Sequence, residues 1–285
     1  MDIIQSPSEM QKWSQAAHRA GRTIGLVPTM GALHEGHLSL VAQARTHADA
    51  AVMSIFVNPM QFGPAEDFNR YPRPLEADCN KAAEAGCDAL FVPQKSDMYP
   101  EGFSTQVTVE ALSARLCGAS RPAHFCGVAT VVLKLFNIVA PDIACFGQKD
   151  AQQVIVLRRM VQDLNVPVTI NVCPTVRERD GLAMSSRNAY LTPAERTAAP
   201  VIYKGLQAAR ALYDKGERNA ADLSRAIEDL FRAAPCIRKE YIEIVDCANL
   251  QPLASVASAA LIAAACRTAE SNTRLIDNVV IGGSL

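Results

Sequence analysis

The sequence predicts an α/β protein in which a larger part with a parallel sheet precedes a smaller α+β part with an antiparallel sheet. Short apolar runs alternate with longer helical patterns up to about residue 175, and such alternation is typical of βαβ units. Beyond that point, two helical stretches precede three consecutive strand-like runs, which favours an antiparallel sheet. The chain has 285 residues, a length that suits two modest domains, and we expect these to be 1–175 and 176–285.

The first part contains strand-like runs that are short and largely apolar, separated by longer helical patterns. The strands are expected at 23–29, 50–57, 88–93, 142–147 and 166–172. The helices are expected at about 36–46, 74–85, 128–139 and 151–164. Because ligands bind beyond the carboxyl ends of parallel strands, we expect the loops after these strands to carry the chemistry.

The second part has the opposite order, with helices before strands. Helices are expected at about 193–213 and 220–233, and strands at 239–246, 257–267 and 273–281. Three strands in succession, without helices between them, predict a small antiparallel sheet.

Composition and charge exclude several classes of function. The chain carries 28 basic and 29 acidic residues, so it has no excess of positive charge that would attract nucleic acid or an anionic membrane over long range. We therefore expect no nucleic-acid partner. The longest apolar stretches, GVATVVLKLFNIVA and LASVASAALIAAAC, are shorter than the roughly 18 to 20 residues of a membrane helix. We expect a soluble protein without a membrane partner.

The cysteines and the N-terminal sequence indicate the compartment. None of the nine cysteines forms a C-x-x-C pair and their number is odd, which favours reduced thiols over a disulfide framework. The N-terminal sequence MDIIQSPSEMQKW lacks the basic and apolar segments of a secretory signal. Both observations predict a cytoplasmic location.

The segment PTMGALHEGH lies where a predicted strand turns into a helix. Gly31 and Gly36 allow tight turns and close approach to a ligand, and the N-terminus of the following helix favours a phosphate. His34 and His37 are three residues apart, so both can donate hydrogen bonds to one phosphorylated ligand. For this motif alone, a structural turn with satisfied histidines and an H-x-x-H metal pair remain alternatives.

Two later segments supply further groups that suit a phosphate. Lys149 and Asp150 follow a predicted strand, where lysine can neutralise a phosphate and aspartate suits a helix start. Ser185, Ser186 and Arg187 offer two hydroxyls and a guanidinium in a compact loop. Each segment alone could be a capped turn or a solvated loop, but with the histidines they predict a triphosphate site. The absence of GxGxxG and GxxxxGK[ST] disfavours ordinary dinucleotide and P-loop sites.

A fourth segment, SIFVNPMQFG, ends a strand with neutral amides. Asn58 and Gln61 suit recognition of hydroxyls or a carboxylate through directed hydrogen bonds. A simple turn formed by Asn-Pro and Phe-Gly is the alternative.

These segments resemble, in order, the motifs of the pantoate–β-alanine ligase family. PTMGALHEGHLSL is similar to the HIGH-type signature of the nucleotidyltransferase superfamily in the form that this family carries. SIFVNPMQFGPAEDFNRYPR, RPAHFCGVATVVLKLFNIVAPD, FGQKDAQQ and PTVRERDGLAMSSRNAYL resemble its later motifs, so that the resemblance covers about 23–193. It implies a Rossmann-like N-terminal domain, a smaller C-terminal lid domain and a homodimer. It also implies that pantoate and ATP, with Mg²⁺, form pantoyl-adenylate and pyrophosphate, and that β-alanine then gives pantothenate and AMP.

The resemblance further implies the residues of the ATP site. Catalysis would involve His34, His37, Lys149 and Arg187, with His37 as the proton donor. The ATP site would comprise Met30, Gly31, Ala32, Leu33, His34, Glu35, Gly36, His37, Gly147, Gln148, Lys149, Asp150, Val176, Met184, Ser185, Ser186 and Arg187.

The same resemblance implies a pantoate site and a metal residue. Gln61 and Gln153 would hold pantoate, with Asn58 and Met30 nearby, and Asp78 would be a second-shell magnesium residue. One departure from the family is Gln148, where glutamate is commoner, and we expect it to change local charge rather than the reaction.

Two other functions compete with this one. A nucleotidyltransferase that joins ATP to a phosphorylated acceptor also uses an HxGH turn, but the neutral Asn58 and Gln61 favour a small acid. A catalytically silent nucleotide-binding module is the second, and the intact phosphate-contacting positions disfavour it.

Overall fold

The computed structural model describes residues 1–64 and 66–285, which form two compact units. The first unit comprises Met1–Ala114, Gly118–Gly147 and Val156–Cys173. The second comprises Arg115–Cys117, Gln148–Ile155 and Pro174–Leu285. The second unit therefore includes two short segments from the earlier part of the chain, which nothing in the sequence pattern indicated.

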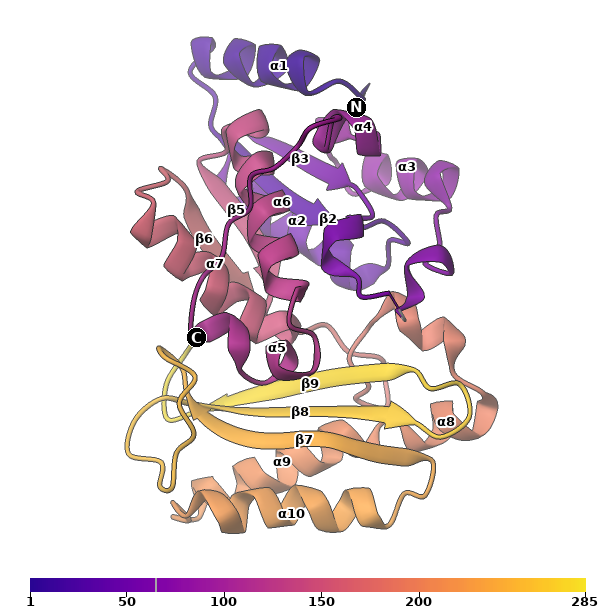
Figure 1. The fold of residues 1–285 in the computed structure, drawn as a ribbon, viewed down its shortest axis with the longest axis vertical. Helices are drawn as coiled ribbons and strands as arrows, with labels where there is room; N and C mark the ends of the chain where they lie inside the picture. The colour runs from indigo at the N-terminus through magenta and orange to yellow at the C-terminus, as the bar shows by residue number, and fades with distance from the viewer. Residues whose placement is uncertain (65) are drawn as a thin grey trace. The chain divides into compact units, whose positions relative to one another are not determined.

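The first unit is built on a six-stranded parallel sheet (Figure 1). Its strands are β1 (Asp2–Ile4), β2 (Ile24–Thr29), β3 (Ala50–Ile55), β4 (Ala89–Phe91), β5 (Ile143–Gly147) and β6 (Thr169–Cys173). They lie in the order β1-β4-β3-β2-β5-β6. The order reverses at β2, since β3 and β4 lie on one side of it and β5 and β6 on the other. In open parallel sheets, this reversal is where ligands bind, beyond the carboxyl ends of the strands.

Helices cover both faces of this sheet. On one face, α2 (Glu35–His47) packs so closely on β2 that a Cβ at Gly25 would lie 3.0 Å from the Ala44 Cβ. Helix α3 (Leu75–Glu84) shares that apolar core through Ala82. Because strand side chains alternate between faces, Ile24 and Leu26 point to the other side, where α1 (Pro7–Arg19) and α6 (His124–Val139) contact β2.

Shorter helices complete the first unit and its connections. They are η1 (Pro59–Gln61), η2 (Asp67–Asn69), α4 (Lys95–Met98), η3 (Leu112–Ala114) and α5 (Cys117–Ser120). Helix α7 (Ala151–Asp163) starts in the second unit, and its residues from Val156 onward belong to the first.

The second unit has a three-stranded antiparallel sheet in the order β7-β8-β9. These strands are β7 (Ile237–Asp246), β8 (Ala260–Thr268) and β9 (Arg274–Ile281). Helices α9 (Val201–Asp214) and α10 (Ala220–Arg232) pack on each other and on this sheet, and their apolar side chains form one core with it (Figure 1). The remaining helices of this unit are η4 (Gln148–Asp150), η5 (Ser186–Tyr190) and α8 (Pro193–Ala198).

The predicted fold class is confirmed, a Rossmann-like parallel sheet with helices plus a separate antiparallel sheet. The largest differences from the predicted elements lie at the N-terminus and in residues 193–213. The N-terminal β1 and α1 were not predicted, although Ser6 caps α1 by accepting a hydrogen bond from the Glu9 amide. The predicted helix 193–213 is two helices, because Pro200 has no N–H to continue α8. Among the described residues, no helix is long and apolar enough to cross a membrane.

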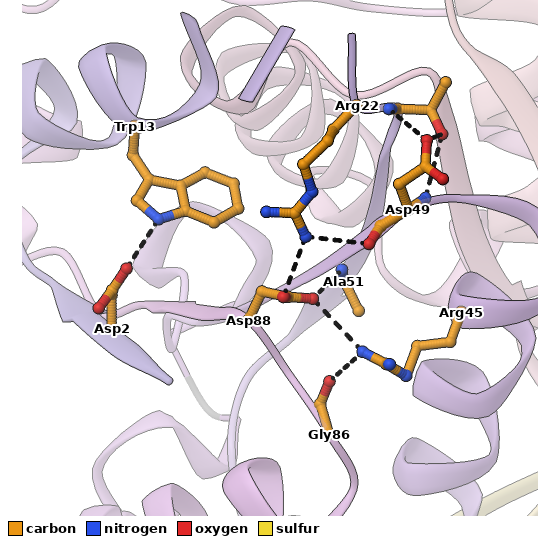
Figure 2. Close-up of polar contacts among 9 residues, drawn as sticks. Asp2, Trp13, Arg22, Arg45, Asp49, Ala51, Gly86 and Asp88 are labelled. Atoms are coloured by element: carbon orange, nitrogen blue, oxygen red, sulfur yellow. Dashed lines mark hydrogen bonds and ion pairs between the residues drawn. The ribbon is translucent and has the colours of Figure 1, made fainter. Parts of the chain in front are cut away.

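A polar network holds the amino ends of the first unit's strands together (Figure 2). Asp88, which precedes β4, accepts hydrogen bonds from the Ala51 amide at 2.9 Å and from Arg22 at 3.2 Å. Its other contact is Arg45 of α2, at 3.4 Å. Arg22 also donates to the Asp49 carbonyl, so that three strand starts are fixed at the edge opposite to the ligand-binding edge.

Replacing Asp88 with alanine is expected to lower the free energy of unfolding by about 1–3 kcal/mol, because the Ala51 amide then has no acceptor. Turnover is expected to stay unchanged in the folded variant, since the network lies at the amino ends of the strands. Urea unfolding of Asp163→Ala is the control, because the ion pair of Asp163 with Arg159 is exposed. Equal stability of the two variants would contradict the role given to Asp88.

Candidate active site

The turn between β2 and α2 has an unusual backbone that a buried carboxylate stabilises. Gly31 has φ 81° and Ala32 has φ 51°, so two successive residues adopt the left-handed conformation. The carboxylate of Asp78 in α3, only 1% exposed, accepts the amides of Ala32 and Leu33, both at 2.8 Å. A Cβ at position 31 would lie 2.9 Å from this carboxylate, so the turn requires glycine there. Lys81, one turn further along α3, donates to the Leu33 carbonyl at 2.7 Å.

The two histidines of this turn lie against each other at the start of α2. Their ring centroids are 4.0 Å apart. His34 caps the helix, and its Nδ1 accepts a hydrogen bond from the Gly36 amide at 3.2 Å. The Nδ1 of His37 accepts one from the His34 amide at 3.4 Å. Because each Nδ1 is an acceptor, each neutral ring carries its proton on Nε2, and Nε2–H is the donor that it can present to a ligand.

The backbone amides of this turn are largely engaged within the chain. Ala32 and Leu33 donate to Asp78, and Gly36 donates to His34. An anion at this turn would therefore meet the imidazoles and the positive end of the α2 dipole rather than a cradle of amides. The chemistry of the turn depends on side chains.

Gln61 lies in η1, beyond the carboxyl end of β3, and its amide reaches Met30. Its Nε2 is 3.0 Å from the Met30 Sδ, a weak acceptor, so a hydroxyl or carboxylate of a ligand would be a better partner. Its Oε1 accepts from Asn58 at 3.2 Å. The predicted neighbours Met30, Asn58 and Gln61 are thus brought together.

Asn58 itself is fully engaged inside the protein. It is 1% exposed, and its Nδ2 donates to Gln61 and to the Gly127 carbonyl at 3.0 Å. Its Oδ1 accepts from the Met60 amide at 3.3 Å and from the Tyr99 hydroxyl at 2.7 Å. Since both donors and both lone pairs are used, Asn58 orients Gln61 and the η1 turn. Burial raises the pKa of Tyr99 above its ordinary value, so its hydroxyl stays a donor.

Residues from a distant segment hold the backbone of Gln61, and sequence reasoning did not assign them. The Gln61 carbonyl is 2.9 Å from His124 Nδ1 and accepts from Arg121 at 3.0 Å. Arg121 also forms a two-pronged pair with Glu66. Burial raises the pKa of Glu66, but the hydrogen bonds and charge of Arg121 outweigh it, so the pKa is lowered overall. The motif RPAHFCG contained both residues, and its position at the start of α6 was the available signal.

The second unit contains the other predicted phosphate-binding residues. Lys149 lies in η4, directly after β5 and its last residue Gly147, and Asp150 ends this short helix. Burial raises the pKa of the Asp277 carboxyl in β9, and the charges of Arg177 and Lys149 oppose this rise. Gln153, the predicted partner of pantoate, is half-buried in the first turn of α7.

A short hairpin leads to the serine-rich segment of the same unit. Arg177 pairs with Ala183, and the Met184 amide donates to the Val176 carbonyl at 3.0 Å. Ser185 then caps η5, and its Oγ accepts from the Arg187 amide at 3.3 Å. The hairpin thus delivers Ser185, Ser186 and Arg187 on one ordered turn.

The structure does not favour a protein-built metal site. Among the described residues, no three His, Cys, Asp or Glu side chains are grouped as metal ligands. The Nδ1 atoms of His34 and His37 accept backbone hydrogen bonds, and both oxygens of Asp78 do the same. Both oxygens of Asp78 thus hold the turn, and its role behind the ligands of a magnesium ion stays a prediction.

Comparisons with known proteins agree in identifying one family. A family model described as Pantoate-beta-alanine ligase matches residues 2–280. The chain is 54% identical over 281 residues to pantothenate synthetases of Heliobacterium modesticaldum and Moorella thermoacetica, each match covering 99% of both chains.

Solved structures give the same result. Pantothenate synthetase from Thermus thermophilus is 49% identical, with a TM-score of 0.92 over 98% of this chain and 99% of that one. Pantoate-beta-alanine ligase from Francisella tularensis, solved with beta-gamma ATP and beta-alanine, is 34% identical. Its TM-score is 0.80 over 98% of this chain and 97% of that one.

Proposed function

The chain belongs to the pantoate–β-alanine ligase family, and we propose that it condenses (R)-pantoate with β-alanine to pantothenate in an ATP-dependent reaction. The observation that carries this proposal is the pair of histidines, held by their Nδ1 atoms at the turn after β2. The reaction is that of an AMP-forming ligase.

The reaction has two balanced steps. A carboxylate oxygen of pantoate attacks the α-phosphorus of ATP, the bond to the β-phosphate oxygen breaks, and pyrophosphate leaves. The amine of β-alanine then attacks the acyl carbon of pantoyl-adenylate, AMP leaves with the bonding electron pair, and the amine loses a proton. Activation is needed because a carboxylate repels nucleophiles, whereas its mixed anhydride with AMP has a good leaving group.

The chain's own residues stabilise the charge that develops on the phosphates. We assign His34 and His37 as donors through Nε2–H, with His37 as the proton donor. Lys149 supplies a positive charge, and Arg187 a planar guanidinium that suits phosphate oxygens. Ser185 and Ser186 add hydroxyl donors. Preorganised donors of this kind lower the barrier without reorganisation during the reaction.

The rest of the predicted ATP site is proposed on the family resemblance. It comprises Met30, Gly31, Ala32, Leu33, Glu35, Gly36, Gly147, Gln148, Asp150, Val176 and Met184. Backbone approach and packing are the roles that suit most of these residues, since few of their side chains carry charge.

Pantoate is proposed to bind at Gln61, with Met30 beside it and Gln153 as a second amide. The Gln61 Nε2 is directed at a thioether sulfur, which a pantoate hydroxyl or carboxylate would displace. Asn58 supports Gln61 rather than contacting pantoate, because its amide is fully used.

Mg²⁺ is proposed to enter as the complex with ATP. Magnesium is usually held by phosphates and one or two carboxylates and keeps several waters, so a dedicated protein cage is not required. No step in this proposal depends on Asp78 as its ligand.

A cytoplasmic location and a homodimer complete the proposal. All nine cysteines are free thiols, which suits a reducing compartment. Sedimentation velocity tests the dimer, for which the expected mass is twice that of one chain.

Pantoate-dependent exchange of labelled pyrophosphate into ATP tests the proposed function. We expect exchange with pantoate and ATP alone, and pantothenate only after β-alanine is added. A nucleotidyltransferase with a phosphorylated acceptor would need that acceptor for exchange, and a silent nucleotide-binding module would show no exchange at all.

Replacing Gln61 with alanine is expected to raise the KM for pantoate about tenfold or more and leave the Kd for ATP near wild type. The reason is that a hydrogen bond to the substrate is lost. Initial rates at varied pantoate concentration measure this effect. Gln43→Ala, an exposed position on α2, is the matched control. Unchanged pantoate kinetics in the Gln61 variant would remove this residue from the pantoate site.

A further inference from the structure

Two adjacent residues of β9, Asp277 and Asn278, contact the η4 turn and the hairpin that leads to Ser185. These segments carry the residues of the second unit that are proposed to bind phosphate. Asp277 and Asn278 lie in the last strand of the chain, far in sequence from either segment. Each is only 4% exposed. Buried polar side chains of this kind are usually fully hydrogen-bonded, and their partners show what they hold.

Asn278 holds the backbone of the η4 turn. Its Nδ2 donates to the carbonyls of Gln148 and Lys149, both at 2.9 Å. Its Oδ1 accepts from the Gln148 Nε2 at 3.3 Å. One buried amide therefore fixes the main chain from which the Lys149 side chain extends. A glutamate at position 148 would lack this donor.

Asp277 holds the hairpin that leads to Ser185. Its carboxylate accepts two hydrogen bonds from Arg177, at 2.6 and 3.0 Å, and one from the backbone N–H of Asn278 at 2.8 Å. Arg177 also donates to the Gly181 carbonyl at 3.1 Å, and its guanidinium carbon lies 3.8 Å from the Tyr203 ring centroid. The arginine is thereby fixed between β9 and the hairpin.

The polar side chains of Asp277 and Asn278 suit a role in fixing the positions of the two turns better than a role in stabilising the fold. A buried ion pair is often no more stabilising than well-packed apolar residues of similar volume. Directed hydrogen bonds, however, define positions that apolar contacts would leave less determined. Because Asp277 and Asn278 are consecutive and hydrogen-bonded to each other, they fix the spacing between the two turns.

We propose that Asp277 and Asn278 are positioning residues that hold Lys149 and the Ser185–Arg187 turn at the spacing required for adenylate formation. This inference rests on the proposed function, in which both segments act on the phosphates of ATP. Neither residue contacts substrate in this proposal, because their polar atoms are used within the chain.

The test is a double-mutant cycle measured by pantoate-dependent pyrophosphate exchange. Asn278→Asp keeps the side-chain shape but removes the two donors to the η4 carbonyls. We expect the exchange kcat to fall about tenfold or more, the scale of a misplaced catalytic group. In a Lys149→Ala background, the same change is expected to lower the rate less than about twofold, since Asn278 acts through Lys149.

A control variant in the same unit separates a loss of stability from a loss of the exchange rate. Ile227→Val in α10 removes one buried methyl group from the core, without touching either turn. We expect this variant to exchange at the wild-type rate while its Tm falls. Asn278→Ala, which adds no charge, replaces Asn278→Asp in the cycle if the aspartate variant does not fold.

The role of Asp277 is tested with Asp277→Asn in the wild-type protein and in an Arg187→Ala background. As for Asn278, we expect a large loss of the exchange rate in the wild type and a small one in the Arg187→Ala background. Equal losses in both backgrounds, or an unchanged exchange rate in folded Asn278 variants, would overturn the inference. Absence of exchange in the wild-type protein would instead contradict the proposed function, so the two failures are distinguishable.

Discussion

Replacing His37 with alanine is expected to lower turnover by about 10²–10³-fold, the scale for losing one preorganised donor to a developing charge. The ring lies 4.0 Å from that of His34, and its Nδ1 is occupied by the His34 amide. We propose that its Nε2–H donates to a phosphate oxygen. Single-turnover formation of pantoyl-adenylate measures the effect on the first step.

The matched control is His47→Ala, because His47 is exposed at the end of the same helix. The control is expected to keep wild-type turnover, and circular dichroism of both variants checks that the fold is retained. Wild-type turnover in the His37 variant would remove this residue from the mechanism.

Replacing Asp78 with asparagine is expected to lower both turnover and stability. One carboxylate oxygen becomes an NH₂ group that faces the amide of Ala32 or Leu33, so one buried donor loses its acceptor. The free energy of unfolding should fall by about 1–3 kcal/mol. Turnover should fall up to about 10²-fold, because a displacement of about 1 Å in a catalytic turn has an effect of that size.

The concentration of Mg²⁺ that gives half-maximal rate distinguishes this role from metal binding. We expect it to be unchanged in Asp78→Asn and in the control Glu76→Gln, an exposed position on α3. A raised magnesium requirement with wild-type stability would show that Asp78 serves the metal and not the turn.

The fold could be predicted because its elements carry strong local signals. Strands β2 to β5 are short apolar runs that end in loops with glycine, asparagine or proline, and the helices between them are longer amphipathic segments. Strand β1 could not be predicted in this way, since it has three residues and its pairing with β4 is decided by tertiary contacts.

The candidate site could be predicted in part. Sequence motifs pointed to His34, His37 and Gln61, and the family resemblance is confirmed by the comparisons. Sequence did not indicate what each polar side chain contacts. It did not indicate that both oxygens of Asp78 accept backbone amides of the β2–α2 turn, or that Asn58 makes four hydrogen bonds within the chain.

The supporting residues were beyond sequence reasoning because they come from distant segments. Tyr99 and Arg121 reach the η1 turn from 41 and 60 residues away. Asn278 reaches the η4 turn from 129 residues beyond Lys149. Such contacts depend on the packing of whole elements, which no local pattern encodes.

Imidazole nitrogen NMR tests the central claim most directly, that His34 and His37 present Nε2–H to the phosphates of ATP. The chain has only five histidines, so single His→Gln variants can assign the signals. We predict that both residues are Nε2–H tautomers in the free protein, and that a non-hydrolysable ATP analogue shifts both Nε2 resonances. Nδ1–H tautomers, or Nε2 signals that saturating nucleotide leaves unchanged, would contradict the account.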